Sequence, residues 1–282
     1  MTKSVRMTRR VSFSSGHRYW IPSLTDRENL NLFGKWASPF NHGHNYVLDV
    51  QVEGLVDTTT GMVVNIKRID DALRATIVRQ FDGKSINDQV PYFHDRSTSL
   101  ENLAVYVCEC LAEPEILPSG VRLTSIRLEE MPTFFVELIT DRTPALMLLT
   151  RSYEFAASHR LDSPYLSPQE NLDLFGKCNN AAGHGHNYLL EVTVTGAPDD
   201  RTGMILNLED LDRLVAELVV DRYDHKNLNV DIPEFEGKVT TSEIVALEIF
   251  DRLKDRLPAK LQRVKLHETA RNVFEVSAPS GA

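Results

Sequence analysis

The chain has 282 residues, of which 42% are hydrophobic and 25% charged, and its net charge is −9. These proportions are typical of a globular protein, and the length suits one large domain or two of ordinary size. The acidic balance argues against broad binding to nucleic acid or to anionic membranes. No segment is long and apolar enough to span a bilayer, and three cysteines do not suggest a disulfide framework. We therefore expect a cytoplasmic protein.

The predicted elements follow the same order twice, with alternating apolar residues indicating strands and helical spacing indicating helices. The first set comprises strands at 5–15 and 42–53, helices at 65–81 and 98–112, and strands at 121–129 and 133–139. The second set comprises strands at 146–157 and 184–196, helices at 208–222 and 241–254, and strands at 261–268 and 273–277. A long polar loop, 18–40, separates the first two strands. Each set predicts an α+β fold of order ββααββ, in which two helices cover one face of an antiparallel sheet.

The chain is a tandem duplication. Three histidines of the first half recur 142 positions later in the second half. The two triplets are His17, His42 and His44, and His159, His184 and His186. The sequences Phe-Gly-Lys, His-Gly-His-Asn-Tyr and Thr-Gly-Met also occur in both copies. Coincidental core histidines would not keep one register across two halves, so we predict two homologous domains, 1–141 and 142–282.

Each histidine triplet has the pattern of a metal site. His184 and His186 lie two residues apart on a predicted strand, so both imidazoles face the same side. His159, near the end of the preceding strand, is the candidate third ligand. Three protein nitrogens and one open position are how a catalytic zinc is held. Cys178 is either a fourth ligand, which would close the site, or a free thiol that acts on whatever occupies the open position.

The sequence Cys-Asn-Asn-x-x-Gly-His-Gly-His-Asn-Tyr, which begins at Cys178, resembles the 6-pyruvoyl-tetrahydropterin synthase family. The resemblance covers nearly the whole chain, as two copies. It implies the tunnelling fold, or T-fold, whose sheets join between subunits into a barrel and so cover their edges. It also implies a Zn²⁺ cofactor and a lyase of tetrahydrobiopterin biosynthesis. Such an enzyme converts 7,8-dihydroneopterin triphosphate to 6-pyruvoyl-tetrahydropterin and triphosphate.

The resemblance assigns roles to residues of the second half. Cys178 is the expected catalytic base, and Asp224 and His225 form the pair that assists it. Glu268 is the expected anchor of the pterin ring, because a carboxylate accepts two parallel hydrogen bonds from ring N–H groups. The residues matched to the rest of the pterin pocket are Thr241, Ser242 and Glu243, which also suit an ordinary capped helix start. Nearby candidates for the triphosphate are Arg160, Lys177 and Lys226.

The first half departs from this pattern. Trp36 stands 142 positions before Cys178, and Gly83 stands 142 positions before His225. The three histidines remain, and so does Glu130, which is matched to Glu268. Because a site with neither thiol nor imidazole cannot run the same proton transfers, we predict a degenerate first half. Both halves are nevertheless expected to hold zinc.

Other functions compete with this prediction. The 6-carboxy-tetrahydropterin synthases of the queuosine pathway use the same substrate, although they typically have a shorter gap after the cysteine than the five residues found here. A zinc-bearing scaffold that binds pterin without turnover and a metal-hydroxide hydrolase are the remaining alternatives.

The expected partners are a small-molecule pterin and further copies of the chain, with no nucleic acid and no membrane. The family stacks two rings of three T-folds, and its Asp-His pair reaches the cysteine of a neighbouring subunit. This resemblance implies a homotrimer of tandem chains, with one ring of second halves and one ring of first halves.

Overall fold

The structure is a computed structural model that describes residues 3–279, and these divide into two compact units. The first unit comprises the described residues up to Leu149 together with Thr195–Asn207. The second comprises Thr150–Val194 and the described residues from Leu208 onward. The predicted domains 1–141 and 142–282 follow the sequence repeat. The compact units differ from these domains mainly because the segment Thr195–Asn207 belongs to the first unit. Within 3–279, no helix has the length and apolar character needed to cross a membrane.

The first unit is built on an antiparallel sheet of four long strands in the order β5-β4-β2-β1, with the two-residue strand β3 parallel to β1. Their bounds are β1 Ser4–His17, β2 His42–Leu55, β3 Lys84–Ser85, β4 Val121–Met131 and β5 Phe134–Ile139. Alternate residues of β1 and β2, such as Phe13 and Tyr46, are buried, as the period of two requires. The predicted strands of the first half are therefore confirmed.

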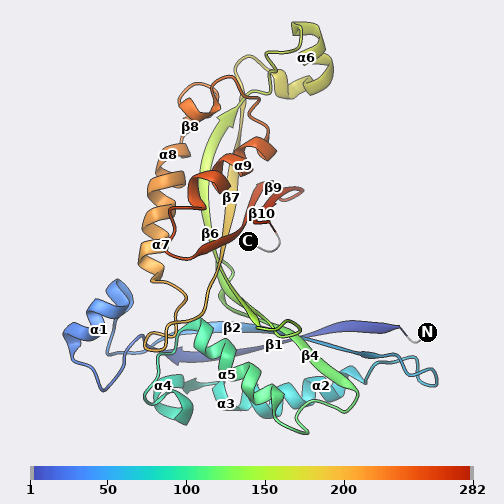
Figure 1. The fold of residues 1–282 in the computed structure, drawn as a ribbon, viewed down its shortest axis with the longest axis vertical. Coiled ribbons are helices and arrows are strands. Elements are labelled where there is room, and N and C mark those ends of the chain that lie inside the picture. Colours follow the sequence, from blue (N-terminus) through green and yellow to red (C-terminus); the bar gives the residue numbers. More distant parts are fainter. Residues whose placement is uncertain (1–2, 280–282) are drawn as a thin grey trace. The chain divides into compact units, whose positions relative to one another are not determined.

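Two helices cover this sheet (Figure 1). Helix α2, Ile66–Leu73, begins after the capping residue Asn65 and continues through one π-helical turn, Arg74–Val78, into α3, Arg79–Phe81. Helix α5, Leu100–Ala112, begins after Ser99, whose hydroxyl accepts the Asn102 N–H. The helices bury Ile69, Leu73, Leu103 and Val107. Both predicted helices are thus present.

The second unit repeats this arrangement. Its long strands lie in the order β10-β9-β7-β6, and the short β8 pairs in parallel with β6. Their bounds are β6 Leu146–His159, β7 His184–Thr195, β8 Lys226–Asn227, β9 Lys260–Thr269 and β10 Asn272–Ser277. The first helix is α7 Leu208–Val215, which continues through a π-helical turn into α8 Asp221–Tyr223. The second helix is α9 Ser242–Leu253. The ββααββ order is therefore confirmed twice, and in neither unit do the described strands close into a barrel.

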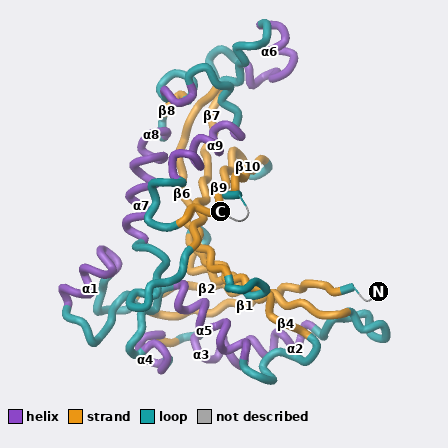
Figure 2. The backbone as a smooth tube through the Cα atoms, viewed as in Figure 1, coloured by secondary structure: helices purple, strands orange, loops and turns teal. Residues whose placement is uncertain are grey.

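The long polar loop predicted at 18–40 contains a helix, α1 Asp26–Phe33, and its counterpart in the second half is α6 Pro168–Phe175 (Figure 2). A four-residue helix, α4 Ile86–Gln89, also follows β3. Both α1 and α6 begin with a capping box, formed by Thr25 with Glu28 and by Ser167 with Glu170. The pattern Ser/Thr-x-x-Glu was the sequence signal for these two helices.

The segment Thr195–Asn207 completes the core of the first unit. Met204 packs in a buried apolar cluster. The other buried members are Tyr19, Ile21 and Phe33. The Ile205 N–H donates to Oε1 of Glu101 at 2.9 Å, and the Glu101 side chain is 1% exposed. A carboxyl group from the first half therefore depends on a backbone donor that lies 104 positions further along the chain.

Burial raises the pKa of Glu101 from 4.5 to about 7. Between these values the folded chain retains a proton that the unfolded chain has lost. The contribution of Glu101 to the free energy of unfolding is therefore fully present below pH 4.5 and is lost as pH rises through 7. In metal-free protein, Glu101→Gln should remove this dependence and stabilise the first unit at pH 8 by up to roughly 3 kcal/mol. Urea unfolding at pH 5 and pH 8 measures the effect.

The control is Glu243→Gln, which changes the matched but exposed residue of the second half and should leave both unfolding curves unchanged. A Glu101→Gln chain that is less stable than the unmodified chain at pH 8 would contradict the expectation.

Candidate active site

The strands of the second unit bring three imidazoles together. His159 is the last residue of β6, and His184 and His186 stand at the start of β7. Their candidate ligating atoms lie within 4.8 Å of one another, and the Nε2 atoms of His159 and His184 are 3.2 Å apart. The predicted triplet is thus a real cluster.

The surroundings of this cluster favour neutral imidazoles. The Nδ1–H of His159 donates to the Thr240 carbonyl at 2.7 Å, which leaves its Nε2 lone pair directed at the cluster. Burial lowers the pKa of His159 and of His184. Nε2 of His186 is buried, and no described residue forms a hydrogen bond with it. Because neutral imidazole is the metal-binding form, this orphaned atom and its neighbours fit a divalent metal ion held by three nitrogens.

A pocket of about 420 Å³ opens beside the cluster. It is lined by the three histidines and by the predicted substrate residues. The residues that sequence analysis had singled out are Cys178, Thr241, Ser242, Glu243 and Glu268. Cys178 lies in a short 3₁₀ turn, Gly176–Asn179, and its thiol is free. The structure therefore brings the proposed base, the metal ligands and the proposed ring anchor to one cavity.

Glu268 is held in this pocket by two donors. Ser242 Oγ donates to its Oε1 at 2.6 Å, and Asn272 Nδ2 donates to its Oε2 at 2.9 Å. Burial raises the pKa of Glu268, but these two hydrogen bonds and the nearby His186 and His159 together lower it more, so the net pKa is lowered. The group is thus fixed as a carboxylate. Sequence reasoning missed Asn272, whose role depends on the turn between β9 and β10.

Asp224 and His225 form a pair outside this pocket. The Nδ1–H of His225 donates to Asp224 Oδ2 at 2.8 Å, and the Ala156 N–H donates to Asp224 Oδ1 at 2.7 Å. The backbone bond and then the imidazole lower the pKa of Asp224. The His225 side chain is 84% exposed. Neither residue lines the Cys178 pocket, so the second unit alone does not bring all of the predicted catalytic residues together.

The backbone of His225 is left-handed, with φ at +57°. The matched residue in the first half is Gly83, whose φ is +70°. A side chain in this region costs about 1 kcal/mol, which glycine avoids. The second half thus keeps an imidazole at a position whose conformation favours glycine.

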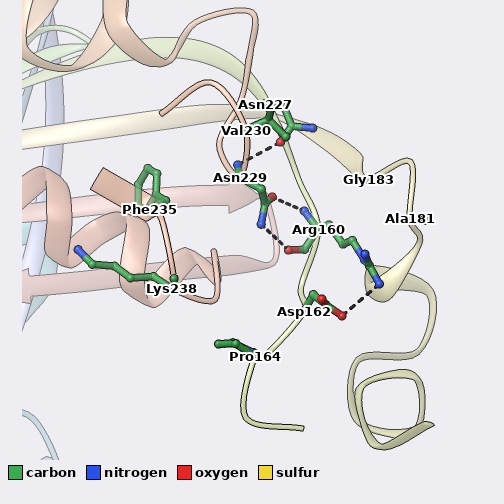
Figure 3. A pocket seen from close by; sticks show the side chains of 11 residues that line it. Arg160, Asp162, Pro164, Ala181, Gly183, Asn227, Asn229, Val230, Phe235 and Lys238 are labelled. Carbon is green, nitrogen blue, oxygen red and sulfur yellow. Dashed lines mark hydrogen bonds and ion pairs between the residues drawn. The ribbon is translucent and has the colours of Figure 1, made fainter. Parts of the chain in front are cut away.

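The three candidates for binding triphosphate are dispersed. Arg160 lines a pocket of about 350 Å³ (Figure 3), in which its backbone N–H donates to Asn229 and its guanidinium contacts Asp162 at 3.1 Å. Lys177 lines the Cys178 pocket, and Lys226 lines a separate hollow with His225. No pocket described here contains all three side chains.

The first unit has a matching histidine cluster. His17, His42 and His44 present ligating atoms within 4.8 Å of one another. Burial lowers the pKa of His17 to about 3 and that of His44 to about 4. Glu130 lies beside them, 3.7 Å from His17 and 3.5 Å from His44. Where the second half has a thiol, Trp36 packs against the apolar cluster of Met204.

The fold and these clusters define a tandem T-fold protein with a three-histidine centre in each half. The sequence model of the family described as 6-pyruvoyl tetrahydropterin synthase matches residues 6–140 and again 148–279. The chain therefore belongs to the 6-pyruvoyl tetrahydropterin synthase family, as two consecutive copies.

Individual relatives agree with this membership. The 6-pyruvoyl tetrahydrobiopterin synthase of Homo sapiens is 50% identical over 126 residues, which are 44% of this chain and 87% of the relative. That of Drosophila melanogaster is 47% identical over 133 residues, which are 46% of this chain and 79% of the relative. The 6-carboxy-5,6,7,8-tetrahydropterin synthase of Rickettsia conorii is 25% identical, covering 48% of this chain and 99% of the relative. The solved synthase of Caenorhabditis elegans is 40% identical, with a TM-score of 0.46, and covers 48% of this chain and 96% of that structure.

Replacing His225 tests whether it serves function at the expense of stability. His225→Gly should leave the unfolding midpoint unchanged or raise stability by up to about 1 kcal/mol, because glycine suits the left-handed backbone and the lost side chain is exposed. His225→Ala removes the same imidazole but retains a Cβ, so it should be less stable than the glycine variant. Thermal unfolding followed by circular dichroism compares them. Equal, marked losses in both variants would show that the imidazole is structural.

Proposed function

We propose that residues 142–282 form a zinc-dependent lyase that converts 7,8-dihydroneopterin triphosphate to 6-pyruvoyl-tetrahydropterin with release of triphosphate. Residues 1–141 form a degenerate copy. The observation that carries this proposal is the 420 Å³ pocket that Cys178, the histidine cluster and Glu268 line together. The pterin-synthase names of the relatives support the substrate class.

His159, His184 and His186 would hold the zinc, whose contribution when bound is to acidify a carbon next to the substrate oxygen that it contacts. Glu268, fixed as a carboxylate by Ser242 and Asn272, accepts hydrogen bonds from the pterin ring and so orients the substrate. Thr241 and Glu243 complete the rim of the pocket.

Cys178 acts as the base that takes the proton from the carbon next to that oxygen. A thiolate is the form that can do this, and a nearby imidazole stabilises it. His225 supplies this imidazole, and Asp224 orients it through the 2.8 Å hydrogen bond to Nδ1. Because this pair does not line the Cys178 pocket of its own unit, a neighbouring chain brings it.

The chain accordingly acts as a homo-oligomer, and we propose a homotrimer with a ring of second halves and a ring of first halves. This arrangement places an Asp224–His225 pair at every Cys178. A cytoplasmic location is part of the proposal, supported by the free state of Cys108, Cys110 and Cys178.

Product analysis by mass spectrometry after incubation with 7,8-dihydroneopterin triphosphate tests the activity. We expect 6-pyruvoyl-tetrahydropterin and triphosphate from the intact chain. Cys178→Ala should lower turnover by at least about 100-fold while the zinc content stays the same, because the thiol acts as a base and not as a ligand. Atomic spectroscopy on the variant measures the metal.

Three results would contradict the proposal in different ways. A 6-carboxy product would assign the second half to the other branch of the family. Tight pterin binding without product would indicate a scaffold. Loss of zinc on Cys178→Ala would make the thiol a fourth ligand and exclude it as the base.

Mixed oligomers test the sharing of the site between chains. Cys178→Ala and His225→Ala chains should each be inactive alone. Oligomers assembled from both should regain activity wherever an intact cysteine meets an intact imidazole. Recovery is measured after co-refolding, with native mass spectrometry confirming mixed composition. Mixed oligomers without recovered activity would mean that the thiol and the imidazole meet within one chain.

A further inference from the structure

The carboxylate beside the first histidine cluster is the structural counterpart of Glu268. In the first unit Val136 pairs with Leu128, and in the second unit Phe274 pairs with Leu266. The residues of the second pair lie 138 positions after those of the first, and not 142. The second half therefore has four fewer residues than the first half between its histidine triplet and its last two strands. The same shift superposes Glu130 on Glu268. Both stand near the end of the third long strand, next to a histidine triplet.

The two carboxylates are nevertheless directed differently. Oε1 of Glu268 is 3.9 Å from Nε2 of both His159 and His186, and Ser242 and Asn272 hold it there. Leu100 and Phe134 occupy the positions of these two donors in the first half, and neither side chain can donate a hydrogen bond.

Glu130 turns both of its oxygens toward the imidazoles. Oε2 lies 3.7 Å from Nε2 of His17, and Oε1 lies 3.5 Å from Nε2 of His44. Two ligands on a tetrahedral zinc, with bonds of about 2.0 Å, are separated by about 3.3 Å. The 3.5 Å between Oε1 of Glu130 and Nε2 of His44 is closer to this value than the 3.9 Å of the second half.

His17 directs its Nε2 atom at Glu130. Its Nδ1–H donates to the Thr98 carbonyl at 3.2 Å, so the neutral ring has a bare lone pair on Nε2. That atom is buried and has no hydrogen-bond partner among residues 3–279, and it faces the carboxylate of Glu130, which is 5% exposed. A nitrogen lone pair and a carboxylate oxygen that face the same point suit a divalent cation between them.

The space beside this cluster also differs from the space beside the second cluster. Trp36, in place of Cys178, packs against the buried cluster of Tyr19, Phe33 and Met204. The ring of Tyr19 lies 5.4 Å from that of His17. In the second half the corresponding thiol lines an open pocket. The first half thus has apolar side chains where the second half admits a ligand.

We propose that His17, His42, His44 and Glu130 bind a zinc-class divalent cation as a closed, four-coordinate structural site. Three nitrogens and one carboxylate oxygen fill a tetrahedral shell, so no position remains for substrate. The role of this metal is to hold β1, β2 and the end of β4 together. The inference is independent of the lyase activity, because it concerns only the first unit.

The two centres can be studied one at a time. His184→Ala removes a ligand from the second centre, so that metal bound to the first can be measured alone. His42→Ala does the same for the second centre. Zinc release to an excess of a chromophoric chelator should be at least 10-fold slower from the first centre than from the second. Cobalt(II) in the first centre should give the intense visible absorption of a four-coordinate ion, unchanged by added pterin.

Replacing the carboxylate of each half by a carboxamide tests whether Glu130 is a metal ligand. In the His184→Ala chain, Glu130→Gln should accelerate zinc release by at least 10-fold and shift the cobalt spectrum. In the His42→Ala chain, Glu268→Gln should change release by less than 3-fold. A first centre without zinc, or one whose release and cobalt spectrum are unaffected by Glu130→Gln, would overturn the proposal. The chelator and cobalt measurements on the His184→Ala chain decide between a closed and an open site even if Glu130→Gln does not fold.

Discussion

The antiparallel pairing of the first two strands in each half is the constraint on which the sites depend. In the first half the register places His17 opposite His42, and His44 follows on the same face. Phe13, Tyr46 and the residues that alternate with them bury that same face. A slip of one residue would turn both the imidazoles and the core side chains outward. Packing energy therefore fixes the arrangement of the imidazoles, and a duplicated core carries a duplicated histidine cluster with it.

Much of the fold could be predicted because periodicity and repetition are local properties of the sequence. The strands, the long helices and the two histidine triplets all follow from spacing. The eight-residue helices α1 and α6 were missed, since two turns show little periodicity and only their capping boxes indicate them. The sequence already pairs Glu130 with Glu268, although the constant offset of 142 no longer holds there, and the strand register gives the same pairing.

Other features of the site depend on three-dimensional detail. The contact from Asn272 to Glu268 requires the turn between β9 and β10 to bring the amide back to the carboxylate. The left-handed backbone of His225 becomes evident from sequence only when Gly83 is set beside it. The separation of Asp224 from the Cys178 pocket could be expected from the family resemblance, although no pattern within this sequence indicates it.

The two halves show how one scaffold supports two kinds of carboxylate. In the second half a hydroxyl and an amide hold Glu268 in place and leave its remaining lone pairs for a ligand. In the first half these donors are replaced by apolar side chains, and Glu130 turns toward the imidazoles. Few substitutions separate the two states, because the sheet beneath them is the same.

The segment Thr195–Asn207 has a consequence for the evolution of the chain. It is encoded in the second copy, yet it seals the apolar cluster and supplies the backbone donor to Glu101 in the first unit. A gene cut at the repeat boundary would produce a first copy with an exposed hydrophobic patch and a buried acid without its donor. The first unit therefore depends on a segment of the second repeat to complete its core.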